Sequence, residues 1–479
     1  MIWYMEEGLT FTEALSLVRG GTTVFTTHTP VPAGHDRFPI EEVKKRLSRF
    51  LEGREELLEL GREGDQLNMT LLAIRTSSYV NGVSKLHAEV SKRMWKDLWP
   101  EVPLDEIPIE GITNGIHTMT WVHNEMRKLF DRYLGKVWRE HTNIEGIWYA
   151  VERIPDEELW EAHLEAKRGG FIELLRRKVL RRNERLGIND TLPEMDENAL
   201  IIGFARRFAT YKRATLLFTD LERLKRILNN PPERPVYLVF GGKAHPMDEA
   251  GKEFLRRVYG VSQMPEFRGR IFVLENYDMG SARFMVAGGV DVWLNNPRRP
   301  MEASGTSGMK AGLNGVLNAS IYDGWWVEGY NGKNGWVIGD ETTEPETEAD
   351  DAKDAQALYD LLEKEIIPTY YSNRERWIYM MKESIKSIAP PRFSTHRMVK
   401  EYMDRFYSKA MSNHIWLTRE NYRGGTKEIA AWKDRVTASW GKVKIENINL
   451  RDDGSGLDVT LYLDGLEPED VKVELYYGG

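Results

Sequence analysis

Apolar runs alternate with amphipathic segments in the middle of the chain. The runs are mostly apolar and cover 199–205, 236–242, 270–274, 290–294 and 317–321. Such runs are typical of strands that are buried on both faces of a parallel sheet. The segments 213–228 and 248–259 lie between them and are expected to be helices. Strands that alternate with helices predict a doubly wound α/β domain.

The pattern is more mixed in the first 140 residues. Thr10 precedes an apolar spacing that begins at Phe11 and is expected to cap a helix. A short β-prone run ends directly before His28. Further helices are expected at 40–61, 66–78 and 85–98.

The last part of the chain changes from helical to β-type patterns. Residues 340–356 are acidic and are expected to form a loop, and helical patterns follow from 355 to 410. From Lys442 onwards, apolar and polar residues alternate as in half-buried strands. This alternation resembles the start of a β-sandwich. Two or three strands do not make a stable domain by themselves.

Composition excludes several classes of protein. The 479 residues carry a net charge of −8 without a prominent basic tract, so no nucleic-acid partner is expected. The chain contains no cysteine, which excludes disulfides and cysteine-ligated metals, and no metal is expected. No apolar run is long enough to span a bilayer, and the first residues lack a signal-peptide pattern. We therefore expect a cytoplasmic protein.

Glutamine is rare and charged residues are abundant. Glutamine occurs only at Gln66, Gln263 and Gln356, whereas charged residues make up 29% of the chain. Few thermolabile side chains and many charges favour a thermophilic source.

Polar residues follow several of the expected strands. Ligands of doubly wound domains bind at the carboxyl ends of strands, and His28, Arg207, Lys243, Tyr277 and Glu302 all follow such runs. For His28 the alternative is a structural role, because a lone histidine is more often structural than functional. Four cations between Arg206 and Arg213 suit a dianionic ligand. They are expected at a helix start, where cations oppose the helix dipole, so anion binding is favoured over a solvated face.

The segment 301–310 combines a carboxylate, a run of small residues and a lysine. Small residues let backbone N–H groups approach an anion, and Lys310 can form a Schiff base with an aldehyde cofactor. The alternative is a glycine-rich connection with an exposed lysine. The segment predicts a site for a sugar or a phosphate with a pyridoxal anchor.

These motifs together resemble the α-glucan phosphorylase family, in particular the maltodextrin and glycogen phosphorylases of archaeal and bacterial type. The resemblance runs from about residue 10 to 410. It rests on four motifs in the family's order: Val80–His87, Thr113–Ile116, Arg206–Arg213 and Glu302–Lys310. It implies an α/β fold of the glycosyltransferase-B-like type, in which the active site lies between two Rossmann-like domains.

The resemblance also implies a reaction, a cofactor and a role for each site residue. An α-1,4-glucan would react with inorganic phosphate to give glucose 1-phosphate, with the phosphate of pyridoxal 5′-phosphate as proton relay. Lys310 would hold this cofactor as a Schiff base, with Lys212, Thr306 and Ser307 near its phosphate and Tyr277 near the cofactor. Arg207 would bind substrate phosphate. The glucosyl unit would contact His28, Asn114, Glu302, Ser304 and Gly305, and the residues expected to act in catalysis are Arg207, Lys212, His28 and Glu302.

The chain departs from the family pattern in three places. One is its abrupt end at Gly479, so we expect a chain that is truncated at both ends. No glycine-rich phosphate loop precedes His28, so we expect only the C-terminal part of the first Rossmann-like domain, at 1–140. A helical linker (141–198), a cofactor-binding Rossmann-like domain with returning helices (199–411) and a linker with a β-sandwich start (412–479) would follow. Many family members place an arginine where Asp278 stands, and Arg206 or Arg213 is expected to compensate. A homo-oligomer is possible within this family.

Two other functions compete with this reading. A nucleotide-sugar glycosyltransferase such as a glycogen synthase has a similar fold, but usually carries a carboxylate where Lys310 stands. An inactive glucan-binding fragment is the second alternative, because the N-terminal part of the site is expected to be missing and because Trp325, Trp326 and Trp336 could stack on sugar rings. Core packing explains most tryptophans more simply.

Overall fold

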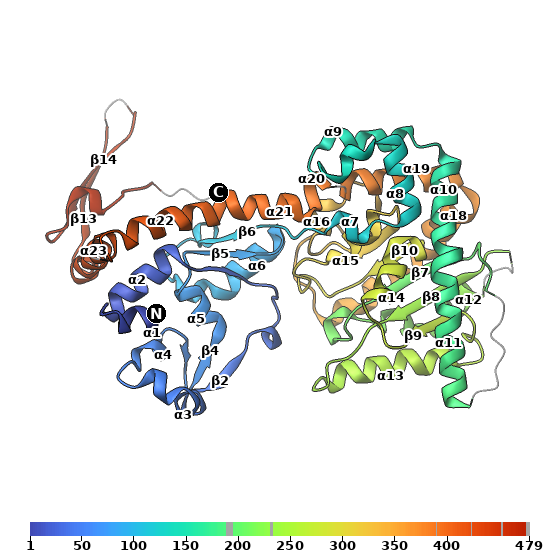
Figure 1. Cartoon of the computed structure of the whole chain (residues 1–479), viewed down its shortest axis with the longest axis horizontal. Coiled ribbons are helices and arrows are strands. Elements are labelled where there is room, and N and C mark those ends of the chain that lie inside the picture. The colour runs from blue at the N-terminus through green and yellow to red at the C-terminus, as the bar shows by residue number, and fades with distance from the viewer. Residues whose placement is uncertain (188–194, 230–232, 389, 423, 452–453, 476–479) are drawn as a thin grey trace. The chain divides into compact units, whose positions relative to one another are not determined.

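The computed structural model describes residues 1–187, 195–229, 233–388, 390–422, 424–451 and 454–475 (Figure 1). The chain forms two compact units. The first comprises Met1–Phe25, His35–Val80 and Asp404–Gly479, and the second comprises Thr26–Gly34 and Asn81–Met403.

A six-stranded parallel sheet forms the centre of the second unit. The order is β12-β11-β10-β7-β8-β9, and every neighbouring pair is parallel. The strands are β7 (Leu200–Ala205), β8 (Val236–Gly241), β9 (Ile271–Leu274), β10 (Val292–Asn295), β11 (Leu317–Ile321) and β12 (Gly335–Ile338). The five predicted strands and the doubly wound α/β class are confirmed, in agreement with a glycosyltransferase-B-like fold. The short strand β12 was not predicted.

The strand order reverses direction between β7 and β10. From β7 the chain adds β8 and β9 on one side, and it then returns to add β10, β11 and β12 on the other. Ligands of doubly wound sheets bind outside the carboxyl ends of the strands at such a reversal. The topology therefore predicts a ligand site at the loops that follow β7 and β10.

The second unit also contains helices. They are α6 (Lys85–Trp95), α7 (Thr118–Trp121), α8 (Asn124–Tyr133), α9 (Glu145–Trp148), α10 (Asp156–Glu165), α11 (Glu173–Leu186), α12 (Leu221–Leu228), α13 (Glu249–Gln263), α14 (Met279–Phe284), α15 (Thr306–Gly312), α16 (Trp326–Gly329), α17 (Asp351–Leu361), α18 (Ile367–Ser372), α19 (Arg374–Ile388), α20 (Pro390–Phe393) and α21 (Thr395–Tyr402). Most of the described residues in 141–198 are helical, and residues 188–194 lie outside the described residues. The assignment of this segment as a linker stays a prediction.

The helix expected at 213–228 does not start where the pattern placed it. Arg213 has a left-handed backbone with φ 48°, which a helix cannot include. A single 3₁₀ turn covers Leu216–Phe218, and α12 starts later, after Asp220, whose side chain accepts a hydrogen bond from Arg223 N at 2.8 Å. The cations from Arg206 to Arg213 therefore lie outside α-helices, with Lys212 in the 3₁₀ turn Thr210–Lys212, so the argument from an α-helix dipole does not apply to them.

A second sheet contains three short strands in the order β1-β5-β6. The strands are β1 (Val24–Thr26), β5 (Tyr79–Gly82) and β6 (Ile109–Gly111). Residues of the expected motifs follow each strand: His28 after β1, Val83 after β5 and Asn114 after β6.

The first unit contains α1 (Ile2–Glu6), α2 (Phe11–Gly21), α3 (Ile40–Leu51), α4 (Glu56–Glu59), α5 (Met69–Arg75), α22 (Ser408–Thr418) and α23 (Gly425–Trp440), with β2 (Arg37–Pro39), β3 (Arg62–Glu63) and β4 (Gln66–Asn68). Thr10 caps α2 as predicted. Its Oγ1 accepts from Glu13 N at 3.2 Å, and its own N–H donates to Glu13 Oε2 at 2.8 Å. The helix expected at 40–61 is divided into α3 and α4, and the one expected at 66–78 starts only after β4.

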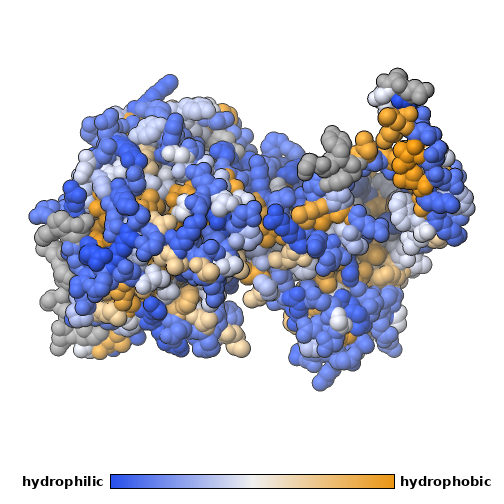
Figure 2. Space-filling view, turned by 180° about the vertical axis from the view of Figure 1, so that it is seen from behind, coloured by the Kyte–Doolittle hydropathy of each residue, from blue (hydrophilic) through white to orange (hydrophobic). Residues whose placement is uncertain are grey.

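The β-type pattern near the end of the chain forms an antiparallel hairpin of β13 (Lys444–Leu450) and β14 (Leu457–Tyr462). Large apolar side chains on it are exposed, among them Ile445, Ile448 and Leu450, and Figure 2 shows them gathered along the hairpin. A complete β-sandwich stays a prediction. Among the described helices, none combines the length and apolar character needed to cross a membrane.

Candidate active site

A polar cavity of about 290 Å³ lies where the strand order reverses. Its lining residues all belong to the second unit and follow strands of both sheets. They are His28, Val83, Asn114, Ala205, Arg206, Arg207, Lys212, Glu302, Ala303, Ser304, Gly305, Thr306 and Ser307. The structure thus brings together most of the expected site residues from four distant segments. Of the expected residues, Lys310 and Tyr277 do not line this cavity.

Glu302 lies in a buried ion cluster at the cavity wall. Its Oε2 is paired with Arg206 Nη2 and lies 3.4 Å from Lys212 Nζ. Burial by itself would raise the pKa of Glu302, but the two cations lower it to about 2. Burial and the charge of Arg206 lower the pKa of Lys212 to about 8. The carboxylate expected to contact sugar is therefore engaged by two cations in this structure.

Asp323 holds the backbone that carries Glu302. Its Oδ2 accepts a hydrogen bond from Glu302 N at 2.9 Å, and its Oδ1 accepts one from Gly324 N at 2.7 Å. Trp325 N donates to Ser304 O at 2.8 Å, so the segment after β11 fixes the segment 302–304 at two points. Burial is the main cause that raises the pKa of Asp323 to about 8.

Ser84 fixes the same segment from the second sheet. Its hydroxyl donates to Ala303 O at 2.8 Å and accepts from His87 N at 3.1 Å, as the N-cap of α6. The expected motif at 80–87 therefore supports the cavity wall, to which it contributes the side chain of Val83.

Several polar groups at the cavity have no partner within the described chain. Arg207 is exposed, and no ion pair is found for it among the described residues. Within the same residues, Ser304 Oγ and Arg206 Nη1 are buried without a hydrogen-bond partner. Native proteins leave few buried polar atoms unsatisfied, so these groups indicate a place for a polar ligand. Burial lowers the pKa of His28, which favours the neutral imidazole.

Lys310 lies on α15, one turn after Thr306. Residues four apart share one face of a helix, so the lysine and the Thr306 hydroxyl are neighbours along it. The Lys310 Nζ lies 4.0 Å from the ring centroid of Trp121, and burial lowers the pKa of the amine. A lowered pKa favours the neutral, nucleophilic amine. Ser307 Oγ accepts a hydrogen bond from Trp293 Nε1 at 3.1 Å.

Tyr277 packs beside the end of β8. A Cβ atom added at Gly241 would lie 2.7 Å from its ring, so glycine makes room for the tyrosine. Burial raises the pKa of Tyr277 well above its ordinary value. The neighbouring Asp278 is exposed and caps α14, where it accepts a hydrogen bond from Ser281 N at 2.8 Å.

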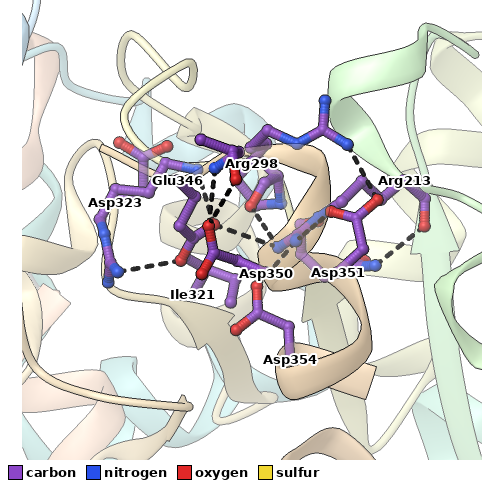
Figure 3. A network of polar contacts seen from close by, with 12 residues as sticks. Arg213, Arg298, Ile321, Asp323, Glu346, Asp350, Asp351 and Asp354 are labelled. Carbon is purple, nitrogen blue, oxygen red and sulfur yellow. Dashed lines mark hydrogen bonds and ion pairs between the residues drawn. The ribbon is translucent and has the colours of Figure 1, made fainter. Parts of the chain in front are cut away.

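Arg213 does not face the cavity, so the expectation that it compensates for Asp278 is wrong. It is buried and donates to Asn296 O at 2.9 Å and to Pro297 O at 2.8 Å. Its guanidinium also lies 2.7 Å from Asp354 and 3.0 Å from Asp351 (Figure 3). Arg206, the other residue named in that expectation, does line the cavity.

The structure also shows site residues that the sequence reasoning missed. Asp323 was not considered, although it follows β11 at the same sheet edge as the other motifs. Trp121 and Ser84 were not assigned to the site, because their contacts with Lys310 and Ala303 join segments far apart in the sequence.

The tryptophans that could have stacked on sugar rings are part of the core. Trp325, Trp326 and Trp336 are only 1%, 0% and 7% exposed. Their burial removes one of the two observations that favoured a purely glucan-binding protein.

Comparison with known proteins is consistent with the site. The family described as carbohydrate phosphorylase matches residues 52–364. The chain is 74% identical to a maltodextrin phosphorylase of Thermococcus litoralis, over 99% of this chain and 57% of the relative. It is 44% identical to a glycogen phosphorylase of Aquifex aeolicus, over 85% of this chain and 60% of the relative. It is 36% identical to a glycogen phosphorylase of Mycobacterium bovis, over 98% of this chain and 57% of the relative.

The chain therefore spans less than two thirds of the length of these curated relatives. The Thermococcus relative comes from a thermophile, in agreement with the composition. The match covers the motifs at 80–87, 113–116, 206–213 and 302–310, which confirms the resemblance drawn from them. The chain belongs to the carbohydrate phosphorylase family.

Proposed function

We propose that the protein is an α-1,4-glucan phosphorylase, a glycosyltransferase that cleaves maltodextrin or glycogen with inorganic phosphate. A phosphate oxygen forms a bond to C1 of the terminal glucosyl unit, the C1–O4 bond breaks, and O4 takes up a proton. The names of the relatives support this activity. The observation that carries it is the cavity itself, where Arg207, which has no ion pair among the described residues, lies beside neutral groups suited to sugar hydroxyls.

The residues present suit pyridoxal 5′-phosphate. Lys310 offers a half-buried amine with a lowered pKa, and Thr306 and Ser307 offer hydroxyls one turn earlier on α15. Lys212 adds a cation on the same cavity wall. We propose that Lys310 holds the aldehyde end, that these three side chains hold the phosphate end, and that Tyr277 contacts the cofactor. When bound, this cofactor supplies a phosphate group that can exchange a proton with the substrate phosphate.

The protein side chains then have distinct tasks. Arg207 and Lys212 bind phosphate and offset the repulsion between two phosphates held close together. His28, Asn114 and Ser304 provide neutral hydrogen-bonding groups for the glucosyl hydroxyls. Gly305, with φ 83°, keeps the backbone close to the cavity without a side chain. An oxocarbenium-like transition state needs such charge placement more than a protein nucleophile.

Glu302 orders the cations of this site. Its charge is retained at neutral pH because Arg206 and Lys212 stabilise it. The ion cluster keeps Lys212 next to the segment 302–307, where the expected sugar and phosphate sites meet. We propose that Glu302 also accepts hydrogen bonds from the glucosyl unit through its remaining oxygen.

The activity is tested by incubating the chain with pyridoxal phosphate, maltodextrin and inorganic phosphate. We expect release of glucose 1-phosphate that depends on phosphate and needs no nucleotide sugar. A parallel reaction with a nucleotide sugar and maltodextrin separates the glycogen-synthase-like alternative. Glucan extension from the nucleotide sugar without phosphorolysis would overturn the proposal.

The cofactor anchor is tested by borohydride reduction followed by peptide mass spectrometry. We expect a pyridoxyl group on Lys310 and none in Lys310→Ala. Lys333→Ala removes an exposed lysine of the same unit and serves as the matched control. An adduct that survives Lys310→Ala would show that the anchor is another residue.

A further inference from the structure

Helix α11 carries a stripe of cations that the sequence reasoning overlooked. The stripe consists of Arg177, Lys178, Arg181, Arg182 and Arg185, at the spacing of a single helix face. The net charge of −8 for the whole chain gives no indication of this local excess of positive charge. The opposite face of α11 carries Leu175 and Val179, which are buried in the core.

The stripe lines a concave surface. With Leu174, Glu275 and Asn276 it encloses a cavity of about 360 Å³, separate from the candidate active site. Glu275 and Asn276 follow β9 directly, so the cavity lies beside the loop that leads to Tyr277. Figure 1 shows α11 crossing next to the sheet that contains β9.

The cations of the stripe are not balanced within the cavity. Glu275 is the single carboxylate among its described lining residues, and it pairs with Arg185 at 2.8 Å. Lys178 Nζ donates to the carbonyl of Glu275 at 3.0 Å. Arg182 has only the side-chain oxygen of Asn183, and Arg181 has no ion pair or hydrogen bond in the part of the chain that the structure describes.

This arrangement destabilises the helix that carries it. Three pairs of like charges stand four residues apart, at 177 and 181, 178 and 182, and 181 and 185, and each such pair disfavours a helix. On the neighbouring helix α13, Lys252 and Arg256 pair with acidic residues three positions earlier. Among the described residues of α11, the stripe has one comparable pair, four positions apart, between Arg177 and Glu173 at 3.7 Å. A face that served solubility alone would be expected to resemble α13.

We propose that the cavity on α11 is a second anion site, which binds a small molecule with two or more linked phosphate groups. Arginine forks bind phosphate oxygens in pairs, and several of them in a concave site select a multiply charged ligand. The small cavity and the acidic remainder of the chain favour such a molecule over a nucleic acid. The proposal does not depend on the phosphorylase activity.

A neighbouring cavity suggests how to define the ligand further. It shares Arg185, Glu275 and Asn276 with the anion site and is lined by Leu255, Tyr259 and other apolar groups. A nucleoside triphosphate could place its phosphates on the stripe and its base among these side chains. Inorganic tripolyphosphate has the same phosphate chain without the base.

The test is calorimetric titration of the full chain with tripolyphosphate, repeated with a nucleoside triphosphate. We expect Arg177→Gln/Arg181→Gln to weaken tripolyphosphate binding at least tenfold. Lys225→Gln/Arg226→Gln removes two cations from α12, outside this cavity, and should leave binding unchanged. If the nucleoside triphosphate binds more tightly than tripolyphosphate, the apolar cavity binds its base. If the two bind equally, the site recognises the phosphate groups alone.

Two results would overturn the proposal. One is tripolyphosphate binding that is unaffected in Arg177→Gln/Arg181→Gln. The other is binding that is lost in Arg207→Ala and kept in the stripe variant, because the anion would then occupy the candidate active site. Thermal unfolding without anion serves as the folding control: the stripe variant should unfold at the wild-type temperature or above, since it loses like-charge pairs.

Discussion

Asp323 Oδ2 accepts a hydrogen bond from the backbone N–H of Glu302 at 2.9 Å. This bond joins two buried acidic residues whose pKa values are shifted in opposite directions. The pKa of Glu302 is lowered to about 2 by Arg206 and Lys212 against the effect of burial, whereas burial raises the pKa of Asp323 to about 8. At neutral pH the site therefore keeps one carboxylate charged and the other largely protonated.

Asp323→Asn should change how stability depends on pH. The pKa of Asp323 is raised above its ordinary value of 3.8, so the folded protein binds a proton that the unfolded chain lacks between these two values. The stability from this carboxyl is complete below about pH 4 and is lost as pH rises towards about pH 8. Asparagine also offers one acceptor fewer, which costs about 1–3 kcal/mol.

Urea unfolding at several pH values measures this effect. We expect the difference in unfolding free energy between wild type and Asp323→Asn to be larger at about pH 5 than at about pH 8. A difference that is constant, or that grows with pH, would contradict the protonated state of Asp323.

Two adjacent arginines should respond differently to alanine substitution. Arg206→Ala leaves the buried Glu302 with Lys212 alone and should destabilise the fold by about 3–5 kcal/mol. Arg207→Ala removes an exposed side chain and should change stability by less than about 0.5 kcal/mol.

Steady-state kinetics complete the comparison of Arg206 and Arg207. Arg207→Ala should raise the KM for phosphate at least tenfold, which corresponds to about 1.4 kcal/mol. An unchanged KM for phosphate in this variant would remove Arg207 from the proposed phosphate site.

The charge of Lys212 should limit phosphate binding at alkaline pH. Burial and Arg206 lower its pKa to about 8, so its positive charge is lost as pH rises through that value. Phosphate affinity of the wild type should therefore fall between about pH 7.5 and about pH 9.5, while that of Lys212→Arg should fall less, because arginine stays charged. Bound phosphate will shift the fall to higher pH. Equal profiles of the two proteins would show that another group titrates.

The ion network around Arg213 should be a major source of stability. Arg213→Met leaves the buried carboxylate of Asp354 without its cation at 2.7 Å, and the expected loss is about 3–5 kcal/mol. Arg256→Met is the matched control, because its pair with Glu253 is exposed and worth less than about 1 kcal/mol. Urea unfolding of both variants checks this, and similar losses would contradict the assigned role.

Local patterns were sufficient to predict the class of the fold and the position of the candidate site. The runs at 199–205 and 236–242 predicted buried parallel strands, because a strand covered on both faces needs apolar residues throughout. The motifs at Arg206 and Glu302 could be placed at strand ends by their order in the sequence alone.

Helix boundaries were predicted less well where a single backbone conformation decided them. Arg213 prevents the helix from starting at the predicted place through its left-handed φ of 48°, which contacts with Asn296, Pro297 and Asp354 hold in place. No feature of the local apolar spacing reports such contacts.

The sequence by itself determined the strands, the motifs and the residues available for chemistry. Only the tertiary structure decided their electrostatic state. Glu302 pairs with Arg206, which lies 96 residues away in the sequence, and the Glu302 backbone donates to Asp323. Lys310 packs on Trp121. The physical reason is that charge states depend on burial and on neighbouring charges, and both are set by the folding of distant segments onto one another.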